Sequence, residues 1–478
     1  MSQGGEFGLE VSKGFVAKIV LAAIGFLGSI VFARVLGPAG YGSFHVILAV
    51  SAVLDNPVSG FGNACKKRIS EYDHDPGEIL TAGFAVALVG AAVVFAGALV
   101  AESFVDYFDM ENGPLLVAVV FSGVVFFKIA QPMVAGLGKF GTAVTLDMLR
   151  SLFTIPLQLL LVVVFGLGVS GMVYGLTVAS LMTVPLTLFV LGVRPAMPSR
   201  STLESLWAYA RFSVPNNFVG TAYSKLDVLL LSAVLGTAAA GQYQIALQLM
   251  LPATLLASVM GSGLFAEVSA QVSRDEAVDG QITNNVAFAS LFAVPLFFGA
   301  LAMPESIVVT VFGGQYRDAA ALLIGLGIYQ IFRTQTTQVS SVLSGYDRPD
   351  LLLWIKTLTV VTNVALGVVL IYQIGALGVV VATVVAEVTS YVLLTYYARR
   401  HVRYAIFPDP LRYQFLAGLV MFAVVELLHR WIGVSSWFEL LTIVSVGAAV
   451  YGIALIALSD VFLFTAKSIL DDAIERYG

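Results

Sequence analysis

Long apolar runs, separated by short polar, glycine or proline segments, follow one another along almost the whole chain. A membrane-spanning helix needs about 20 mostly apolar residues, and the sequence supplies about fourteen runs that meet this length. A transmembrane β-strand would instead give alternating segments of about ten residues, which the sequence lacks. We therefore predict an all-α polytopic membrane protein. The predicted helices cover residues 15–36, 41–63, 78–101, 114–136, 145–166, 171–193, 205–235, 240–266, 285–303, 319–340, 351–373, 376–397, 411–430 and 436–458. The segment SLWAYARF at the start of the long seventh run is a candidate interfacial helix.

Composition leaves no room for a soluble domain. Hydrophobic residues make up 58% and charged residues 12% of the 478 positions, against roughly 45–50% and 25% in ordinary soluble domains. The single cysteine, Cys65, excludes an internal disulfide framework, and we expect a buried or interfacial thiol. The motifs GxxxxGK[ST], HExxH, CxxC and GxSxG are absent. We therefore predict a transporter rather than an enzyme, with no cofactor and no nucleic-acid partner.

Lysine and arginine are distributed unevenly between the two sides of the predicted membrane. With a cytoplasmic N-terminus, sixteen of the 25 basic residues fall in inside segments, and only Arg317 and Arg430 fall outside. This bias predicts a cell-membrane protein with both termini in the cytoplasm. The first apolar run contains Lys18 and Arg34 and offers no small-residue cleavage site, so we expect it to remain as the first helix.

Two short phrases occur twice at corresponding positions. VLGPAGYGSF at 35–44 returns as VLGTAAAGQY at 234–243, and the Gly168-x-x-Gly171 spacing returns at Gly375 and Gly378. Both pairs are six predicted spans apart, which indicates two parallel six-helix repeats related by an axis along the membrane normal. The predicted organisation is an N-terminal lobe at 1–198, a C-terminal lobe at 199–400, and two additional helices with a tail at 401–478.

Several stretches resemble one known family. FARVLGPAGYGSF and GFGNACKKRISEY in the first half, with KLDVLLLSAVLGTAAAGQYQIALQL, PESIVVTVFGGQYRDAAALL, SGYDRP and IGALGVVVATVVAE in the second, resemble the polysaccharide exporters, or lipid-linked oligosaccharide flippases, of the multidrug/oligosaccharidyl-lipid/polysaccharide (MOP) superfamily. The resemblance covers roughly residues 12 to 400 in order. It implies a flippase that moves a lipid-linked oligosaccharide from the cytoplasmic to the outer leaflet by alternating access. The implied partners are a polyprenyl-phosphate- or polyprenyl-diphosphate-linked oligosaccharide, membrane lipids and glycan-assembly enzymes.

Basic side chains inside the predicted spans suit that substrate. Each costs about 2.5–3.5 kcal/mol at a helix centre on insertion scales, so it should face a protein interior or a water-filled cavity. Arginine and lysine hold phosphate oxygens through charge-assisted hydrogen bonds. Lys18, Arg211 and Lys356 lie near helix ends, where snorkelling to the interface explains them equally well. The candidate phosphate-binding residues are Arg34, Lys128, Arg333, Lys225 and Arg211.

Carboxylates inside the spans raise the question of energy coupling. The lipid II flippase branch of the resembled family has a sodium site on its seventh, eleventh and twelfth helices. That resemblance implies coupling to Na⁺ or H⁺, although a second carboxylate on the eleventh helix is absent here. For Asp147 and Glu426 we expect a structural role as partners of a nearby base, and Asp55 remains a further candidate. The candidate ion-coupling residues are Asp227, Asn363, Thr383 and Glu387.

Two other functions remain open. A multidrug (MATE-like) or organic-cation antiporter would share the fold, but we would expect acidic groups in its N-terminal lobe, whereas the first helix carries Lys18 and Arg34. A membrane glycosyltransferase or polymerase would need a metal-binding motif, and Asp73-His74-Asp75 spells DxD. Turn residues surround that motif and no soluble domain accompanies it, which favours a solvated turn.

Overall fold

The computed structural model describes residues 3–71, 75–102, 112–274, 276, 281–402 and 404–464, with side chains described from residue 23 onward. Helices and short connections account for these residues, and no strand occurs among them. Twelve helices in the described part of the chain are long and apolar enough to cross a membrane. The predicted all-α membrane fold is therefore confirmed, while the count of fourteen spans stays a prediction.

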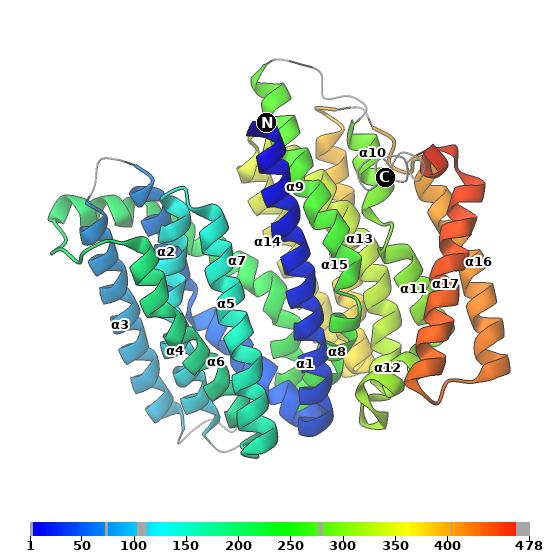
Figure 1. Cartoon of the computed structure of the whole chain (residues 1–478), viewed down its shortest axis with the longest axis horizontal. Coiled ribbons are helices and arrows are strands. Elements are labelled where there is room, and N and C mark those ends of the chain that lie inside the picture. The colour runs from blue at the N-terminus through cyan, green and yellow to red at the C-terminus, as the bar shows by residue number, and fades with distance from the viewer. Residues whose placement is uncertain are drawn as a thin grey trace. The chain divides into compact units, whose positions relative to one another are not determined.

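The chain divides into two compact units, Met1–Gly241 and Gln242–Gly478 (Figure 1). The predicted lobe boundaries at 198/199 and 400/401 stay predictions. The helices of the first unit are α1 (Gln3–Leu54), α2 (Asn56–Ile69), α3 (Pro76–Ala101), α4 (Gly113–Gly136), α5 (Phe140–Leu159), the π-helical turn η1 (Leu160–Val164), α6 (Gly168–Leu191) and α7 (Arg200–Leu235). Helix α8 (Thr237–Leu249) begins in the first unit and ends in the second. The remaining elements are α9 (Pro252–Ser273), α10 (Gln281–Ala289), α11 (Ala293–Ala302), α12 (Pro304–Phe312), the 3₁₀ turn η2 (Gly314–Tyr316), α13 (Ala319–Gly345), α14 (Pro349–Ile374), α15 (Ala376–Ala398), α16 (Asp409–Ile432) and α17 (Trp437–Leu458).

Helix breaks occur inside three predicted runs. The run 41–63 is interrupted at Asp55, between α1 and α2. The run 240–266 is divided between α8 and α9, and Pro252 occupies the first turn of α9, where its missing N–H costs nothing. The run 285–303 is divided between α10 and α11. Apolar composition thus located the runs but not the breaks within them.

The repeated phrase repeats a backbone conformation. Gly37 has φ 69° and ψ 176°, and Gly236, its counterpart, has φ 86° and ψ 170°. In the second pair, Gly168 and Gly375 also have positive φ, 57° and 62°. Such angles strain residues with a Cβ atom, so glycine is required where each of these helices begins or turns.

The two copies of the phrase also pack against each other within the first unit. A Cβ atom on Gly42 would lie 1.8 Å from the carbonyl oxygen of Thr237, and one on Gly241 would lie 2.1 Å from that of Pro38. Pro38 and Thr237 each follow the positive-φ glycine of their own copy. The contact is therefore reciprocal, and we call it the glycine crossing: residues 38–42 of α1 against residues 237–241 of α8.

Hydrogen bonds join the start of α7 to the C-terminal end of α2 and to the first turn of α3. The Arg68 guanidinium donates to the carbonyl oxygen of Ser205 at 3.0 and 3.2 Å, and Glu78 accepts from Ser199 and Thr202. The segment SLWAYARF is part of α7, with Trp207 and Phe212 exposed. Helical structure was therefore correct for this segment, and its interfacial location stays a prediction.

Glutamine side chains of α13 stabilise the broken helices of the second unit. The side-chain amide of Gln330 donates to the carbonyl oxygen of Met250 at 3.3 Å, and that of Gln338 donates to Ala257 at 2.8 Å. Gln335 donates to Val286 on α10 at 3.0 Å. These hydrogen bonds tie α13 to the break at Met250 and to the backbones of α9 and α10.

Candidate phosphate and ion sites

Lys128 and Asp55 form an ion pair inside the first unit. Asp55 lies at the break between α1 and α2, and its carboxylate pairs with the ammonium of Lys128 on α4. The side chain of Asp55 is 7% exposed and that of Lys128 is 34% exposed. The second carboxylate oxygen of Asp55 accepts from the Ser59 hydroxyl at 2.9 Å. The helix break thus places a carboxylate where it holds Lys128, and part of the lysine remains accessible.

A second lysine adds to the positive charge. Lys225 on α7 lies within electrostatic range of Lys128 and of His45. The His45 ring packs edge-on against Tyr41 and Phe44, with centroid distances of 4.6 and 5.4 Å. We call Lys128, Lys225 and Asp55 the lysine cluster. The two ammonium groups of this cluster outnumber its single carboxylate.

Polar contacts between α2 and α7 fix the position of Lys225. The Thr221 hydroxyl, one turn before Lys225, donates to the side chain of Asn56 at 2.9 Å. Gly60 on α2 lets the helices approach closely, because a Cβ atom there would lie 2.6 Å from Val214. The break at Asp55 and the packing of α7 therefore place both lysines in the same region.

Unlike the two lysines of the cluster, the two predicted arginines of the first unit are exposed. Arg34 on α1 and Arg211 on α7 have exposed side chains, and the Arg211 guanidinium lies 4.7 Å from the centroid of the Phe212 ring. Exposure near an aromatic ring suits the snorkelling alternative for Arg211. The side chain of Lys18 lies outside the described residues.

Arg333 and Glu387 meet in the second unit. Their closest nitrogen and oxygen atoms, Nη1 of Arg333 on α13 and Oε1 of Glu387 on α15, are 3.9 Å apart, and Glu387 is fully buried. Lys356 on α14 is exposed and lies within electrostatic range of Arg333. Arg333 therefore lies beside a buried carboxylate, as Lys128 does in the first unit.

Two of the predicted ion-coupling residues are in direct contact. The side-chain amide of Asn363 on α14 donates to the hydroxyl of Thr383 on α15 at 3.2 Å. Glu387 follows Thr383 by one turn of α15, and both are buried. Asp227, also buried, belongs to α7 of the first unit. The structure thus brings together Asn363 and Thr383, with Glu387 one turn away.

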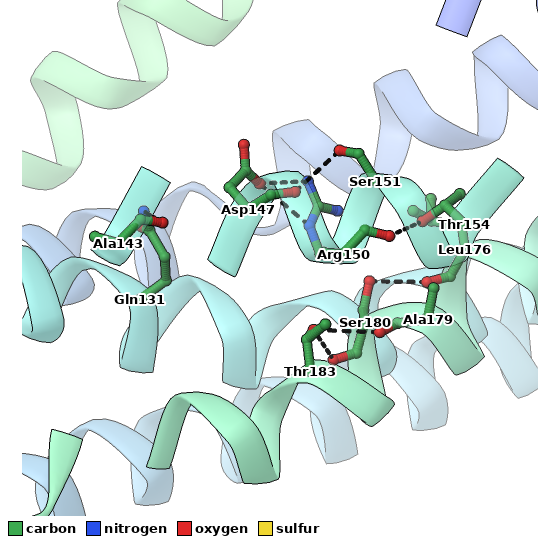
Figure 2. Close-up of polar contacts among 10 residues, drawn as sticks. All are labelled: Gln131, Ala143, Asp147, Arg150, Ser151, Thr154, Leu176, Ala179, Ser180 and Thr183. Atoms are coloured by element: carbon green, nitrogen blue, oxygen red, sulfur yellow. Dashed lines mark hydrogen bonds and ion pairs between the residues drawn. The ribbon is translucent and has the colours of Figure 1, made fainter. Parts of the chain in front are cut away.

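Asp147 and Glu426 have the structural partners that the sequence predicted. In Figure 2, the carboxylate of Asp147 faces the guanidinium of Arg150 on α5, at 2.9 Å. Arg150 also lies over the Phe127 ring, 5.1 Å from its centroid. Glu426 pairs with Arg430 at 2.7 Å on α16. These confirmed local pairs explain two of the intramembrane carboxylates without a transport role.

Two further expectations concern Cys65 and the DxD motif. Cys65 is a free, buried cysteine, as predicted. Asp75 caps α3 by accepting from the backbone N–H of Gly77 at 2.7 Å, whereas Asp73 and His74 lie outside the described residues. Within the described part of the chain, no group of three histidine, cysteine or acidic side chains is arranged to hold a metal ion.

Comparison with known proteins gives the family. A family model described as "Polysaccharide biosynthesis protein" matches residues 31–321, which is more than half of the chain. The chain belongs to the polysaccharide biosynthesis protein family. The "Probable low-salt glycan biosynthesis flippase Agl15" of Haloferax volcanii is 26% identical over 442 residues, covering 92% of this chain and 93% of that relative.

Solved structures confirm the fold of this member of the polysaccharide biosynthesis protein family. The lipid II flippase MurJ, in an inward closed conformation, superposes with a TM-score of 0.76 at 14% identity, covering 92% of this chain and 97% of that chain. An inward-facing MATE family transporter of the MOP superfamily gives 0.64 at 16% identity, covering 81% and 98%. The chain is therefore a multi-pass membrane protein with the transporter fold of the MOP superfamily, as predicted.

Proposed function

We propose that this protein flips a lipid-linked oligosaccharide from the cytoplasmic to the outer leaflet of the cell membrane by alternating access. The observation that carries the proposal is the lysine cluster of the first unit. Charged groups are expensive within a membrane and are retained there for function, and an excess of positive charge suits an anionic substrate. Family membership and the flippase name of the Haloferax volcanii relative support the same assignment.

The proposed substrate is an oligosaccharide linked to a polyprenyl phosphate or diphosphate. Its phosphate oxygens accept charge-assisted hydrogen bonds from Lys128 and Lys225 of the first unit. Arg333 of the second unit is a separate candidate for phosphate binding. Asp55 holds Lys128 in place until phosphate competes for the ammonium. The lipid tail stays in the bilayer while the glycan crosses. Glycan-assembly enzymes are the proposed further partners, and the proposed topology has both termini in the cytoplasm.

A leaflet-accessibility assay tests the proposal. Full-length protein is reconstituted into liposomes with a fluorescent polyprenyl-diphosphate-linked oligosaccharide, and a membrane-impermeant reductant is added outside. The protein is expected to bring the inner-leaflet pool within reach of the reductant, whereas empty liposomes protect that pool. The same labelled glycan on an uncharged polyprenol should remain protected. Equal movement of both lipids would contradict recognition through phosphate.

A depletion experiment separates flipping from synthesis. Cells depleted of the protein are expected to accumulate the complete lipid-linked oligosaccharide on the inner leaflet. A glycosyltransferase or polymerase would instead leave the oligosaccharide unfinished. An antiporter of organic cations has less support, because the Haloferax volcanii relative that matches 92% of this chain is named a flippase.

Substitution of Arg34 tests an exposed member of the phosphate set. At normal membrane levels, Arg34→Ala is expected to abolish flipping if this guanidinium receives the phosphate on entry, measured with the same liposome assay. Arg200→Ala is the control, because Arg200 is an exposed arginine paired with Glu204 at 2.8 Å. Full activity of the Arg34→Ala protein would remove Arg34 from the phosphate-binding set.

We propose ion-coupling roles for Asn363, Thr383 and Glu387 in the second unit and, independently, for Asp227 in the first unit. The Asn363–Thr383 contact supports this set, because side-chain oxygens are the ligands that Na⁺ and other hard cations take. Thr383→Val is expected to remove the stimulation of flipping by an imposed Na⁺ or H⁺ gradient. Thr389→Val is the matched control on α15, since the Thr389 hydroxyl is exposed and bonds only its own helix among the contacts described. Unchanged gradient dependence in Thr383→Val would exclude this site.

A further inference from the structure

A cavity of about 910 Å³ lies in the second unit, and its lining includes none of the candidate residues discussed above. It is formed by the last turns of α15, the segment that leads into α16, and Thr283 of α10. Tyr391, Thr395 and Arg399 line it from successive turns of α15, and Tyr404 lines it from the following segment. The positive-inside pattern predicts that this end of α15 faces the cytoplasm.

The charge of the cavity is positive. Arg399 and Arg400 both line it, and its described lining contains no acidic residue. Arg400 is held at the rim by Tyr396, since its guanidinium lies 4.6 Å from the centroid of that ring and donates to the tyrosine hydroxyl at 2.5 Å. An arginine pair without a carboxylate in the same cavity favours an anionic ligand.

Two buried hydroxyl groups also line the cavity. Thr395 and Tyr404 are only 6% and 7% exposed. Their hydroxyls lie near each other, but the geometry is poorer than that of an ordinary hydrogen bond. Burial raises the pKa of Tyr404 to about 12, so its hydroxyl remains a donor at neutral pH. Because a buried hydroxyl that lacks a well-formed hydrogen bond is costly, ligand oxygens that accept from these groups would be stabilising.

The same part of α15 faces outward. Val392 and Tyr396 line the cavity and have largely exposed side chains. On a membrane-spanning helix such side chains contact acyl chains, and tyrosines collect at the level of the lipid headgroups. The cavity thus combines an apolar, lipid-facing side with a basic end.

We propose that this cavity binds the headgroup of an anionic membrane phospholipid. Arg399 and Arg400 bind the phosphate, and an acyl chain lies along Val392 and Tyr396. The hydroxyls of Thr395 and Tyr404 donate to the remaining headgroup oxygens. The site is separate from the lysine cluster and does not depend on the proposed glycan substrate. Its occupant is a resident lipid of the cytoplasmic leaflet rather than cargo.

Native mass spectrometry of the full-length protein in detergent tests this site. The probes are phosphatidylglycerol, phosphatidylcholine and inorganic phosphate, each added at the same concentrations. We expect retention of phosphatidylglycerol over phosphatidylcholine, and a loss of affinity of about tenfold or more in Arg399→Gln/Arg400→Gln, because hydrogen bonds to charged groups are the strong ones. Tyr404→Phe and Thr395→Val, which keep shape and charge, should each weaken binding by a smaller factor.

Arg412→Gln is the matched control. Arg412 is an exposed arginine on α16, paired with Asp409 at 3.1 Å, and does not line the cavity. It should retain phosphatidylglycerol like the wild type. Equal retention of the two phospholipids, or unchanged binding in both the arginine double variant and Tyr404→Phe, would overturn the proposal. Binding of inorganic phosphate without phosphatidylglycerol, or copurification of a polyprenyl phosphate at this site, would also overturn it, because the source of the phosphate would then not be a phospholipid.

Discussion

Gly42→Ala is expected to destabilise the protein by at least about 3 kcal/mol, the upper part of the usual range for overpacking. The new methyl group would lie 1.8 Å from the carbonyl oxygen of Thr237. That oxygen belongs to the backbone of α8, so no side chain can rotate to make room. Gly241→Ala should have a similar effect, through the carbonyl oxygen of Pro38 at 2.1 Å. The measurements are the melting temperature in detergent and the fraction of monodisperse protein on size exclusion.

Gly25→Ala provides the control in the same helix. Nothing lies within 4 Å of a Cβ atom at Gly25, and alanine favours a helix over glycine by about 1 kcal/mol. This variant should therefore melt at or above the wild-type temperature. A Gly42→Ala protein that melts together with Gly25→Ala would show that the glycine crossing is not tightly packed.

Lys128→Gln is expected to reduce flipping by about 10- to 100-fold, since hydrogen bonds to charged groups contribute about 1.5–3 kcal/mol. It also leaves Asp55 buried without its cation, and breaking a buried pair commonly costs about 3–5 kcal/mol of stability. Flipping is therefore measured in liposomes per correctly folded molecule. Lys67→Gln is the control, because Lys67 is an exposed lysine paired with Glu71 at 3.2 Å.

A double variant separates the two roles of Lys128. In Asp55→Asn/Lys128→Gln both charges are gone, so most of the stability should return. Flipping should nevertheless stay low if the ammonium binds phosphate. Wild-type flipping by this stable double variant would mean that Lys128 serves only to neutralise Asp55, and the phosphate-binding role would have to be withdrawn.

The apolar pattern predicted most helix positions closely because glycine and proline mark their ends. The run predicted at 114–136 became α4 (Gly113–Gly136), and the run at 376–397 became α15 (Ala376–Ala398). The break before Pro252 was missed because apolar residues continue through it, whereas the break at Asp55 was missed although Asp55, Asn56 and Pro57 interrupt the run with turn residues. What stabilises such a break is tertiary, as when Gln330 of α13 bonds the carbonyl oxygen of Met250, and no local sequence window contains that partner.

The sequence predicted individual candidate site residues, but not which of them lie together. Each intramembrane charge was visible because it interrupts an apolar run, and both Lys128 and Asp55 were found in this way. Their pairing was not predicted, because Asp55 lies at a helix break 73 residues before Lys128 on α4 and no spacing rule connects them. The same applies to Arg333 and Glu387. Asn363 and Thr383 were grouped through the family resemblance, and the hydrogen bond between them gives that grouping a physical contact.

The glycine crossing bears on how the chain is made. Its two halves, residues 38–42 and 237–241, are translated far apart, and the second half follows the linker between α6 and α7, residues 192–199. The face of α1 at Gly42 therefore has no packing partner during co-translational insertion until α8 has been inserted. A gene split within the linker would yield an N-terminal fragment that lacks residues 237–241. The glycine crossing could then form only after the two fragments had associated.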